Sequence, residues 1–435
     1  MTVLGAGLAG VEAAHALSRN GFKVRLCEMK PQKRSPAHKH DGFAELVCSN
    51  SLKADIIAED SSAESKSVPK NAASLLKAEM RLLGSLTLEV AELTRVPAGG
   101  ALAVDRTAFS DEITRRIKSD PNIEVVEGEV VDFPENNAVI ATGPLTSDAF
   151  AEAIKQKCGG FLSFYDAAAP IVTADSINVE KAFMAARYGK GDADYFNCPF
   201  TKEEYDIFYD ALVNAESAPL NSFDKVNFYE GCMPVEVLAK RGYDSLRYGC
   251  MKPVGLTDPH TGKRPYAVLQ LRKENSGGTM YNLVGFQTNL KFGEQKRVFS
   301  LIPGLENAEF VRYGVMHRNT FLDSPRLLDN NFMLRGSSGI YFAGQITGVE
   351  GYMESAASGI VAGLSLAGKL NPIPRTSIIG ALANYISDET VVNFQPMGAN
   401  MGILPSLDAV IKGKQERYEK LAERAIFDLK SSFTI

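Results

Sequence analysis

Apolar and polar positions follow two different periods along this chain, and the changes between them mark out its predicted elements. Residues 11–21, VEAAHALSRNG, place apolar side chains at helical spacing and end at a glycine. Residues 23–28, KVRLCE, follow as a short predicted strand. Residues 339–363 have the pattern of a buried strand, a glycine-rich turn and a helix of small residues. Both ends of the chain therefore predict strand and helix units of an α/β domain.

The middle of the chain has a mixed pattern that differs from both ends. Its clearest segments are one predicted helix and two predicted strands, residues 201–216, 266–272 and 281–288. A chain of 435 residues, 45% of them hydrophobic, is too long for one compact pair of layers. We therefore expect a discontinuous nucleotide-binding domain, residues 1–150 and 331–435, interrupted by an inserted α+β domain, residues 151–330.

A glycine fingerprint lies between the first predicted strand and the first helix. VLGAGLAG carries Gly5, Gly7 and Gly10 in the G-x-G-x-x-G spacing, and Glu28 ends the next strand. Such glycines allow a tight turn and close approach of the backbone to a pyrophosphate, while the acid accepts from ribose hydroxyls. FAD or NAD is therefore indicated, and a purely structural turn is the less favoured alternative. The predicted cofactor contacts here are Gly5, Ala6, Gly7, Leu8, Ala9, Gly10 and Glu28.

Two further segments favour FAD over NAD. The late strand, turn and small-residue helix at 339–363 are typical of enzymes that hold FAD in an N-terminal Rossmann unit. Residues 136–144, NNAVIATGP, match the strand and turn found in the same flavoproteins. A small-residue helix used only for core packing stays open as the alternative. The additional predicted cofactor contacts are Gly143, Gly344, Gln345, Gly351 and Tyr352.

Net charge and hydropathy limit the kinds of partner that this protein is expected to bind. The net charge of −5 means that any RNA contact needs a local basic face. Residues 30–40, KPQKRSPAHKH, hold four Lys or Arg and two His before any acid, which predicts a phosphate clamp. The chain shows no apolar run of membrane-spanning length and no signal-peptide pattern, so we expect a cytoplasmic protein without membrane contact.

The six cysteines are spread along the chain without any C-x-x-C pair. This spacing argues against a disulfide framework or a zinc site, and we expect no metal. Cys48 lies in FAELVCSNSL, and Cys232 comes just before Met233 and Pro234, a sequence typical of a helix start. A thiol at a helix start can have a lowered pKa and act as a nucleophile. Packing as a small apolar side chain is the alternative, and composition alone favours it.

Motifs along nearly the whole chain closely resemble those of the TrmFO family. They include GAGLAG, FAELVCSNSL, RVPAGGALAVDR, YEGCMPVEVLAKRG, VGFQTNLKFGEQKRVF and FAGQITGVEGYMESAASG. Members of this family are methylenetetrahydrofolate- and FAD-dependent tRNA (uracil-54-C5) methyltransferases. The resemblance implies a Rossmann-like FAD-binding domain, glutathione-reductase-like and related to MnmG, with an inserted α+β domain that contributes to the folate and RNA site.

The resemblance also implies a reaction, C5 methylation of tRNA uridine 54 in the T loop. 5,10-methylenetetrahydrofolate is the implied one-carbon donor, reduced FAD the methylene carrier and hydride source, and NAD(P)H the external reductant. A thiolate must add to C6 before C5 becomes nucleophilic, and a base held in a loop must first leave its stack. We assign Cys232 to the attack on C6 and Cys48 to the base or flavin partner. An exchange of these two roles stays open.

The resemblance implies further site residues, and both these residues and the implied function have alternatives. His317 is proposed to stack on the pterin, with a purely structural histidine as the alternative. Ribosomal RNA as the substrate, an MnmG-like wobble-uridine modification, or a non-catalytic FAD- and RNA-binding scaffold are the rival functions. No obligatory protein partner is evident. The candidates for folate carboxylate or RNA phosphate are Arg95, Arg106, Lys291, Lys296, Arg297 and Arg318.

Overall fold

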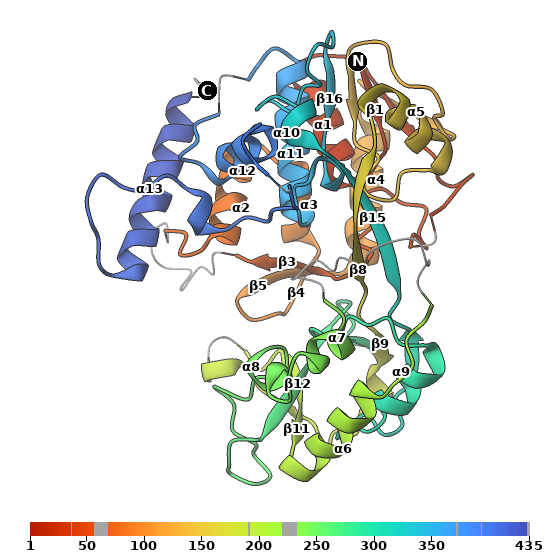
Figure 1. Cartoon of the computed structure of the whole chain (residues 1–435), viewed down its shortest axis with the longest axis vertical. Coiled ribbons are helices and arrows are strands. Elements are labelled where there is room, and N and C mark those ends of the chain that lie inside the picture. Colours follow the sequence, from red (N-terminus) through yellow and green to blue (C-terminus); the bar gives the residue numbers. More distant parts are fainter. Residues whose placement is uncertain are drawn as a thin grey trace.

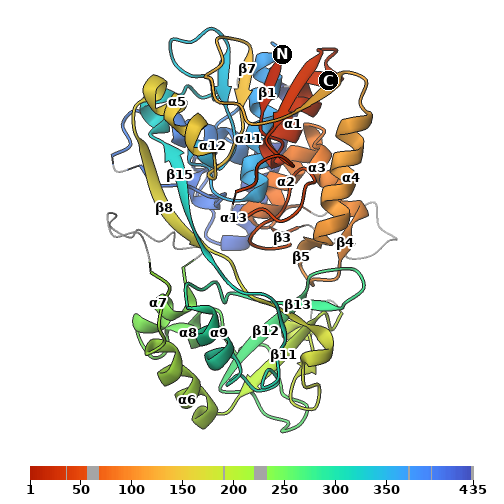
Figure 2. The same cartoon turned by 90° about the vertical axis from the view of Figure 1, so that its right-hand side faces the viewer.

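Two large hydrophobic cores divide the chain between an upper and a lower lobe (Figures 1 and 2). The first core uses residues before 159 and after 320, and the second uses residues 172–308. Domain boundaries near 150 and 330 stay a prediction. The computed structural model describes residues 1–35, 37–55, 68–189, 192–219, 233–370, 373–392 and 394–432, and among these it leaves out the side chains of 161–166, 317 and 318.

The upper lobe is built on a five-stranded parallel sheet with the order β16-β7-β1-β2-β6. In chain order these strands follow the Rossmann arrangement, and the direction of winding reverses between β1 and β7. The predicted α/β Rossmann-like fold is therefore confirmed. The strands are β1 (Thr2–Leu4), β2 (Val24–Glu28), β6 (Ile123–Glu127), β7 (Ala138–Ile140) and β16 (Ile340–Phe342).

Helices α1 (Leu8–Arg19) and α11 (Tyr352–Leu366) pack closely on one another beside this sheet. A Cβ atom at Gly359 would lie 2.1 Å from the carbonyl oxygen of Ala9, and one at Gly363 would lie 2.8 Å from that of Ala13. These glycines of α11 therefore allow two helix backbones to approach. The role of these two glycines is helix packing.

The other helices of the upper lobe surround the sheet and its small antiparallel neighbour, ordered β3-β5-β4, and the last two long helices pack on α2 (Figure 1). The last helix buries one apolar stripe and exposes its charged positions, as expected of an amphipathic surface helix. These elements are α2 (Ala72–Leu82), α3 (Leu86–Leu93), α4 (Arg106–Ser119), α5 (Asp148–Cys158), α10 (Ser324–Leu327), α12 (Ile378–Ser387), α13 (Lys414–Ser432), β3 (Ser51–Ala54), β4 (Arg95–Val96) and β5 (Ala101–Val104).

The lower lobe contains a six-stranded sheet, ordered β10-β11-β12-β13-β9-β14, packed with short helices. Helix α6 begins with a capping box between Thr201 and Glu204. The strand expected at 281–288 ends at Leu283, because Gly285 turns the chain with a φ of +78°. The elements are β9 (Ile171–Thr173), β10 (Phe183–Met184), β11 (Tyr195–Phe200), β12 (Ala267–Lys273), β13 (Met280–Leu283), β14 (Phe310–Arg312), α6 (Lys202–Val213), α7 (Val235–Lys240), α8 (Ser245–Tyr248) and α9 (Phe292–Phe299).

Two long antiparallel strands, β8 (Phe161–Ala167) and β15 (Met316–Leu322), run between the lobes (Figure 1). Their register pairs His317 with Asp166. The backbone position of His317 is therefore on the connection between the two cores.

Candidate active site

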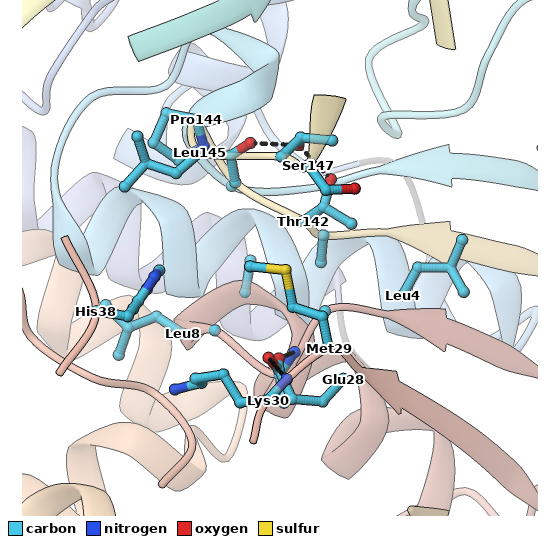
Figure 3. Close-up of a pocket in the computed structure, with 18 of the residues that line it drawn as sticks. Leu4, Leu8, Glu28, Met29, Lys30, His38, Thr142, Pro144, Leu145 and Ser147 are labelled. Carbon is cyan, nitrogen blue, oxygen red and sulfur yellow. Dashed lines mark hydrogen bonds between the residues drawn. The ribbon is translucent and has the colours of Figure 1, made fainter. Parts of the chain in front are cut away.

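A cleft opens at the carboxyl ends of the parallel strands, where the strand order reverses (Figure 3). Open α/β sheets bind their ligands at this point. Thr142, Pro144 and Leu145 follow β7 on one side of the cleft, and Glu28 and Met29 lie at the end of β2 on the other. We call it the switch-point cleft. Its lining residues are 4–9, 27–30, 38, 44, 45, 47, 128–130, 141–147, 150, 344, 345, 352 and 355.

The glycines of the fingerprint have two different tasks. Gly5 has a φ of +92°, and a Cβ atom at Gly10 would lie 1.8 Å from its carbonyl oxygen, so these two build the tight turn. A Cβ atom at Gly7 or Gly143 would meet no protein atom within 4 Å. Both of these line the cleft, where a side chain would occupy the space open to a ligand. This cradle fits the pyrophosphate of a dinucleotide.

Glu28 holds the fingerprint loop from the end of β2. Its Oε2 accepts from the backbone N–H of Ala6 at 2.8 Å, and its Oε1 accepts from that of Lys30 at 3.0 Å. The carboxylate retains further acceptor positions for ribose hydroxyls. Gly7 is the N-cap of helix α1 and has no side chain to cap it, so the first-turn N–H groups and the helix dipole favour an anion.

Most of the predicted cofactor contacts meet at the cleft. The exceptions are Gly10, which packs behind the turn, and Gly351, the N-cap of α11, which has a φ of +123°. The predicted contacts that line the cleft are Gly5, Ala6, Gly7, Leu8, Ala9, Glu28, Gly143, Gly344, Gln345 and Tyr352. Other lining residues were not predicted as cofactor contacts, among them Met29, Lys30, His38, Val47, Thr142 and Leu145.

The basic segment at 30–40 differs from the predicted phosphate clamp. Lys30 is buried, donates to the carbonyl oxygens of His40 and Gly42, and lies 3.7 Å from a carboxylate oxygen of Glu45. Lys33 and Arg34 pair with acids outside the segment, Glu129 and Asp41. These carboxylates offset much of the positive charge that the sequence indicates. Burial also lowers the pKa of His38, which lines the cleft.

Cys48 lies in the loop before β3, at residues 46–50, which we call the Cys48 loop. The hydroxyl of Tyr352 accepts from the backbone N–H groups of Cys48 at 2.8 Å and Ser49 at 3.2 Å. The same oxygen lies 2.8 Å from Sγ of Cys48. Burial, and then the negative charge of Cys48, raise the pKa of Tyr352 well above its usual value. Tyr352 and Val47 line the switch-point cleft, so Cys48 lies at its edge.

Two arginines, one from each lobe, donate to the same carbonyl group of the Cys48 loop. Nη1 of Arg312 lies 2.9 Å from the oxygen of Val47, and Nη1 of Arg106 lies 3.4 Å from it. Arg106 also donates to Leu46 and pairs with Glu274 at 2.7 Å. Burial, and then the charge of Arg106, lower the pKa of Arg312 to about 10, so it remains protonated at neutral pH.

A third arginine fixes the other side of the loop. Nε of Arg272 donates to Oδ1 of Asn50 at 3.0 Å, and its Nη2 donates to Oγ of Ser49 at 2.8 Å. Nδ2 of Asn50 donates in turn to the carbonyl oxygens of Lys273 and Val104. Asn50 therefore joins the β12 strand of the lower lobe to the β5 strand of the upper lobe.

The other predicted site residues are only partly placed. Cys232 lies outside the described residues; the chain resumes at Met233, and α7 begins at Val235. The side chains of His317 and Arg318 also lie outside the description. Of the six predicted anion contacts, Arg106 is at the Cys48 loop. Three others pair with nearby acids: Arg95 with Glu92, Lys291 with Glu216, and Arg297 with Glu294. Lys296 is exposed on α9.

The described residues hold no group of three His, Cys, Asp or Glu arranged to bind a metal ion. In the same residues, no helix has the length and apolar character needed to cross a membrane. Cys27, Cys158, Cys198 and Cys250 are thiols without a disulfide.

Comparison with known proteins assigns the chain to a family. A family model described as Glucose inhibited division protein A (GIDA) matches residues 1–374. A curated protein from Acetivibrio thermocellus, named Methylenetetrahydrofolate--tRNA-(uracil-5-)-methyltransferase TrmFO, is 57% identical over 437 residues, which cover 99% of this chain and 98% of the relative. This chain belongs to the TrmFO family. A TrmFO of the same name from Listeria innocua is 55% identical, covering 99% of this chain and 98% of its own.

Solved structures agree on the fold of this TrmFO family member. Aquifex aeolicus GidA superimposes in two crystal forms with TM-scores of 0.68 and 0.67, covering 99% of this chain and 72% and 77% of those chains. The sequence identities are 16% and 17%, so this likeness shows the fold alone. The TrmFO relatives, by contrast, match across nearly their whole length.

Proposed function

We propose that this protein methylates C5 of a uridine in RNA, with uridine 54 in the T loop of tRNA as its substrate. Relatives with 57% and 55% identity carry the name Methylenetetrahydrofolate--tRNA-(uracil-5-)-methyltransferase. The structural observation that carries the proposal is the contact between Cys48 and Tyr352 at the edge of the switch-point cleft. It puts a thiol beside a space that suits a dinucleotide.

FAD is the proposed resident cofactor. The open positions at Gly7 and Gly143 and the carboxylate of Glu28 suit its pyrophosphate and ribose. When bound and reduced, FAD would supply the hydride and carry the methylene group of 5,10-methylenetetrahydrofolate. NAD(P)H is the proposed external reductant. Residues 151–330 are proposed to form the inserted domain that contributes to the folate and RNA site. The proposed cellular location of the protein is the cytoplasm, which it shares with tRNA.

The chain's own groups divide the work on the uracil. Cys232 is proposed to add to C6, which makes C5 nucleophilic, and Cys48 to accept the C5 proton. His317 is proposed to stack on the pterin. Cys48 suits its role because Tyr352, which it contacts, lines the cleft.

Methylated uridines should be mapped by mass spectrometry in total RNA from cells with and without this protein. We expect loss of 5-methyluridine at tRNA position 54 when the protein is absent. A loss confined to ribosomal RNA would replace the tRNA substrate with a ribosomal one. Unchanged RNA in both fractions would remove the methyltransferase proposal.

The two cysteine roles are separated by RNA that contains 5-fluorouridine, because fluorine at C5 cannot leave as a proton and traps the C6 thioether. Cys232→Ala should abolish the adduct seen on a denaturing gel, and Cys48→Ala should still form it. Cys158→Ala, a buried thiol outside the cleft, is the matched control and should behave like the wild type. An adduct that persists without Cys232 and vanishes without Cys48 would exchange the two roles.

A further inference from the structure

The hydroxyl group of Tyr352 decides which partner donates in its contact with Cys48. A phenolic oxygen has two acceptor positions and one proton. The backbone N–H groups of Cys48 and Ser49 fill both acceptor positions. Sγ of Cys48, 2.8 Å away, is a third neighbour of the same oxygen. The tyrosine proton is the hydrogen left for this contact, so the sulfur atom accepts it.

An accepting sulfur atom favours one protonation state. A neutral thiol is a weak acceptor, whereas a thiolate carries a full charge and forms stronger, charge-assisted hydrogen bonds. A hydrogen bond to the charged form of a group stabilises that form. The direction of the Tyr352 hydroxyl therefore favours deprotonated Cys48.

The charges around the Cys48 loop act in the same direction. Burial and Arg106 lower the pKa of Arg312, whereas Glu274, Tyr352 and Cys48 raise it when they are negative. Coupling between two charges is reciprocal, so positive Arg312 stabilises negative Cys48 to the same degree. Arg272, which donates to Ser49, adds a third guanidinium group to those of Arg106 and Arg312 at the loop. The described groups there also include the carboxylate of Glu274, which pairs with Arg106.

We propose that Tyr352, Arg106 and Arg312 are positioning residues that hold Cys48 as a thiolate at the edge of the switch-point cleft. This inference rests on the proposed function and gives Cys48 its task there. The thiolate accepts the C5 proton of the bound uracil: an S–H bond forms, the C5–H bond breaks, and its electron pair stays on the base. The two main-chain N–H groups keep the Tyr352 proton directed at the sulfur, so the arrangement exists before the substrate binds.

The test is the pH dependence of Cys48 alkylation by iodoacetamide, followed by mass spectrometry of the peptide that contains it. The FAD-loaded wild type is compared with Tyr352→Phe and Arg312→Gln. Tyr385→Phe is the matched control for the first variant, because that hydroxyl donates to the carbonyl of Gln395 away from the cleft. Arg424→Gln is the control for the second, because Arg424 likewise donates to two loop carbonyl groups.

For the wild type we expect a midpoint clearly below the ~8.5 of an ordinary cysteine. A hydrogen bond to a charged group corresponds to about one pKa unit or more, so each test variant should raise the midpoint by about one unit. The controls should leave it in place. Arg312→Lys, which retains the charge, should restore part of the shift.

Two results would overturn the inference: a wild-type midpoint at the ordinary value, or a midpoint that neither test variant moves. A purely structural role would change the alkylation rate at high pH without moving the midpoint. Flavin content and the urea midpoint of each variant show whether it folds, and Arg312→Gln gives an answer even where Tyr352→Phe does not fold. Alkylation needs neither RNA nor folate. Failure here therefore leaves the RNA proposal open, and unchanged RNA would leave the thiol profile intact.

Discussion

The two tasks assigned to the fingerprint glycines give a direct test of the cofactor site. Gly7→Ala places a methyl group where no protein atom lies within 4 Å, and Gly7 has a φ of −73°, which alanine adopts readily. The helix start loses about 1 kcal/mol from a poorer cap. Reduced freedom of the unfolded chain returns about 0.4–1 kcal/mol. The free energy of unfolding should therefore stay nearly unchanged.

Gly10→Ala is the contrasting variant. Its methyl group would lie 1.8 Å from the carbonyl oxygen of Gly5, so α1 would have to move away from the turn. Forcing an extra carbon into a packed site costs about 1–3 kcal/mol. We expect Gly10→Ala to lose both stability and flavin. Gly7→Ala should lose flavin alone, with affinity falling at least about tenfold, the equivalent of roughly 1.4 kcal/mol of binding free energy.

Both quantities should be measured on matched preparations. Flavin per chain comes from the absorbance of the denatured holoprotein, and stability from urea midpoints of the apoprotein, because bound ligand itself stabilises the folded state. Gly293→Ala in α9 is the control, since its methyl group also meets no atom within 4 Å but lies outside the cleft. Flavin binding by Gly7→Ala at wild-type affinity would refute the assignment of this cradle to the pyrophosphate.

Three other outcomes follow from packing and burial. Gly359→Ala should lower the free energy of unfolding by about 1–3 kcal/mol, measured by urea midpoint, because its Cβ atom would lie 2.1 Å from Ala9 O. Burial raises the pKa of Glu79 to about 8 from an unfolded value of 4.5, so the native state binds the extra proton. Its contribution to stability should therefore fall as pH rises from about 4.5 to 8, and Glu79→Gln should flatten that part of a urea-midpoint series. Cys27→Ala, in a buried strand, should lower the urea midpoint without removing the 5-fluorouridine adduct.

The cofactor loop was predictable from sequence because its chemistry is local. Gly5, Gly7 and Gly10 belong to one turn, and Glu28 follows at the end of the adjacent strand, so spacing alone brings them together. The same holds for α6, where Thr201 and Glu204 form a capping box within one helical turn. Contacts inside a short segment leave a pattern that a sequence can display.

Arg106 was among the predicted anion contacts, but the other two arginines at the Cys48 loop were missed for the opposite reason. Arg272 lies in the mostly buried strand β12 and Arg312 at the end of the short, partly exposed strand β14, and no local period relates them to Cys48. Their contacts with the loop span 222 and 265 residues of sequence. A charged side chain within a buried strand is the signal that would have found Arg272, because a buried charge requires partners. The identity of those partners depends on the packing of both lobes.

The position of the Cys48 loop shows why the nucleotide fold alone does not determine the chemistry. GidA shares the fold over 99% of this chain at 16% identity, and a shared fold supports different reactions. In this chain, Arg106 of the upper lobe and Arg312 of the lower lobe meet at the carbonyl group of Val47. Tyr352 approaches the same loop from α11, which begins beside the switch-point cleft. The environment of the Cys48 thiol is therefore formed only where both cores and the cleft meet, and substitutions in either lobe should alter it.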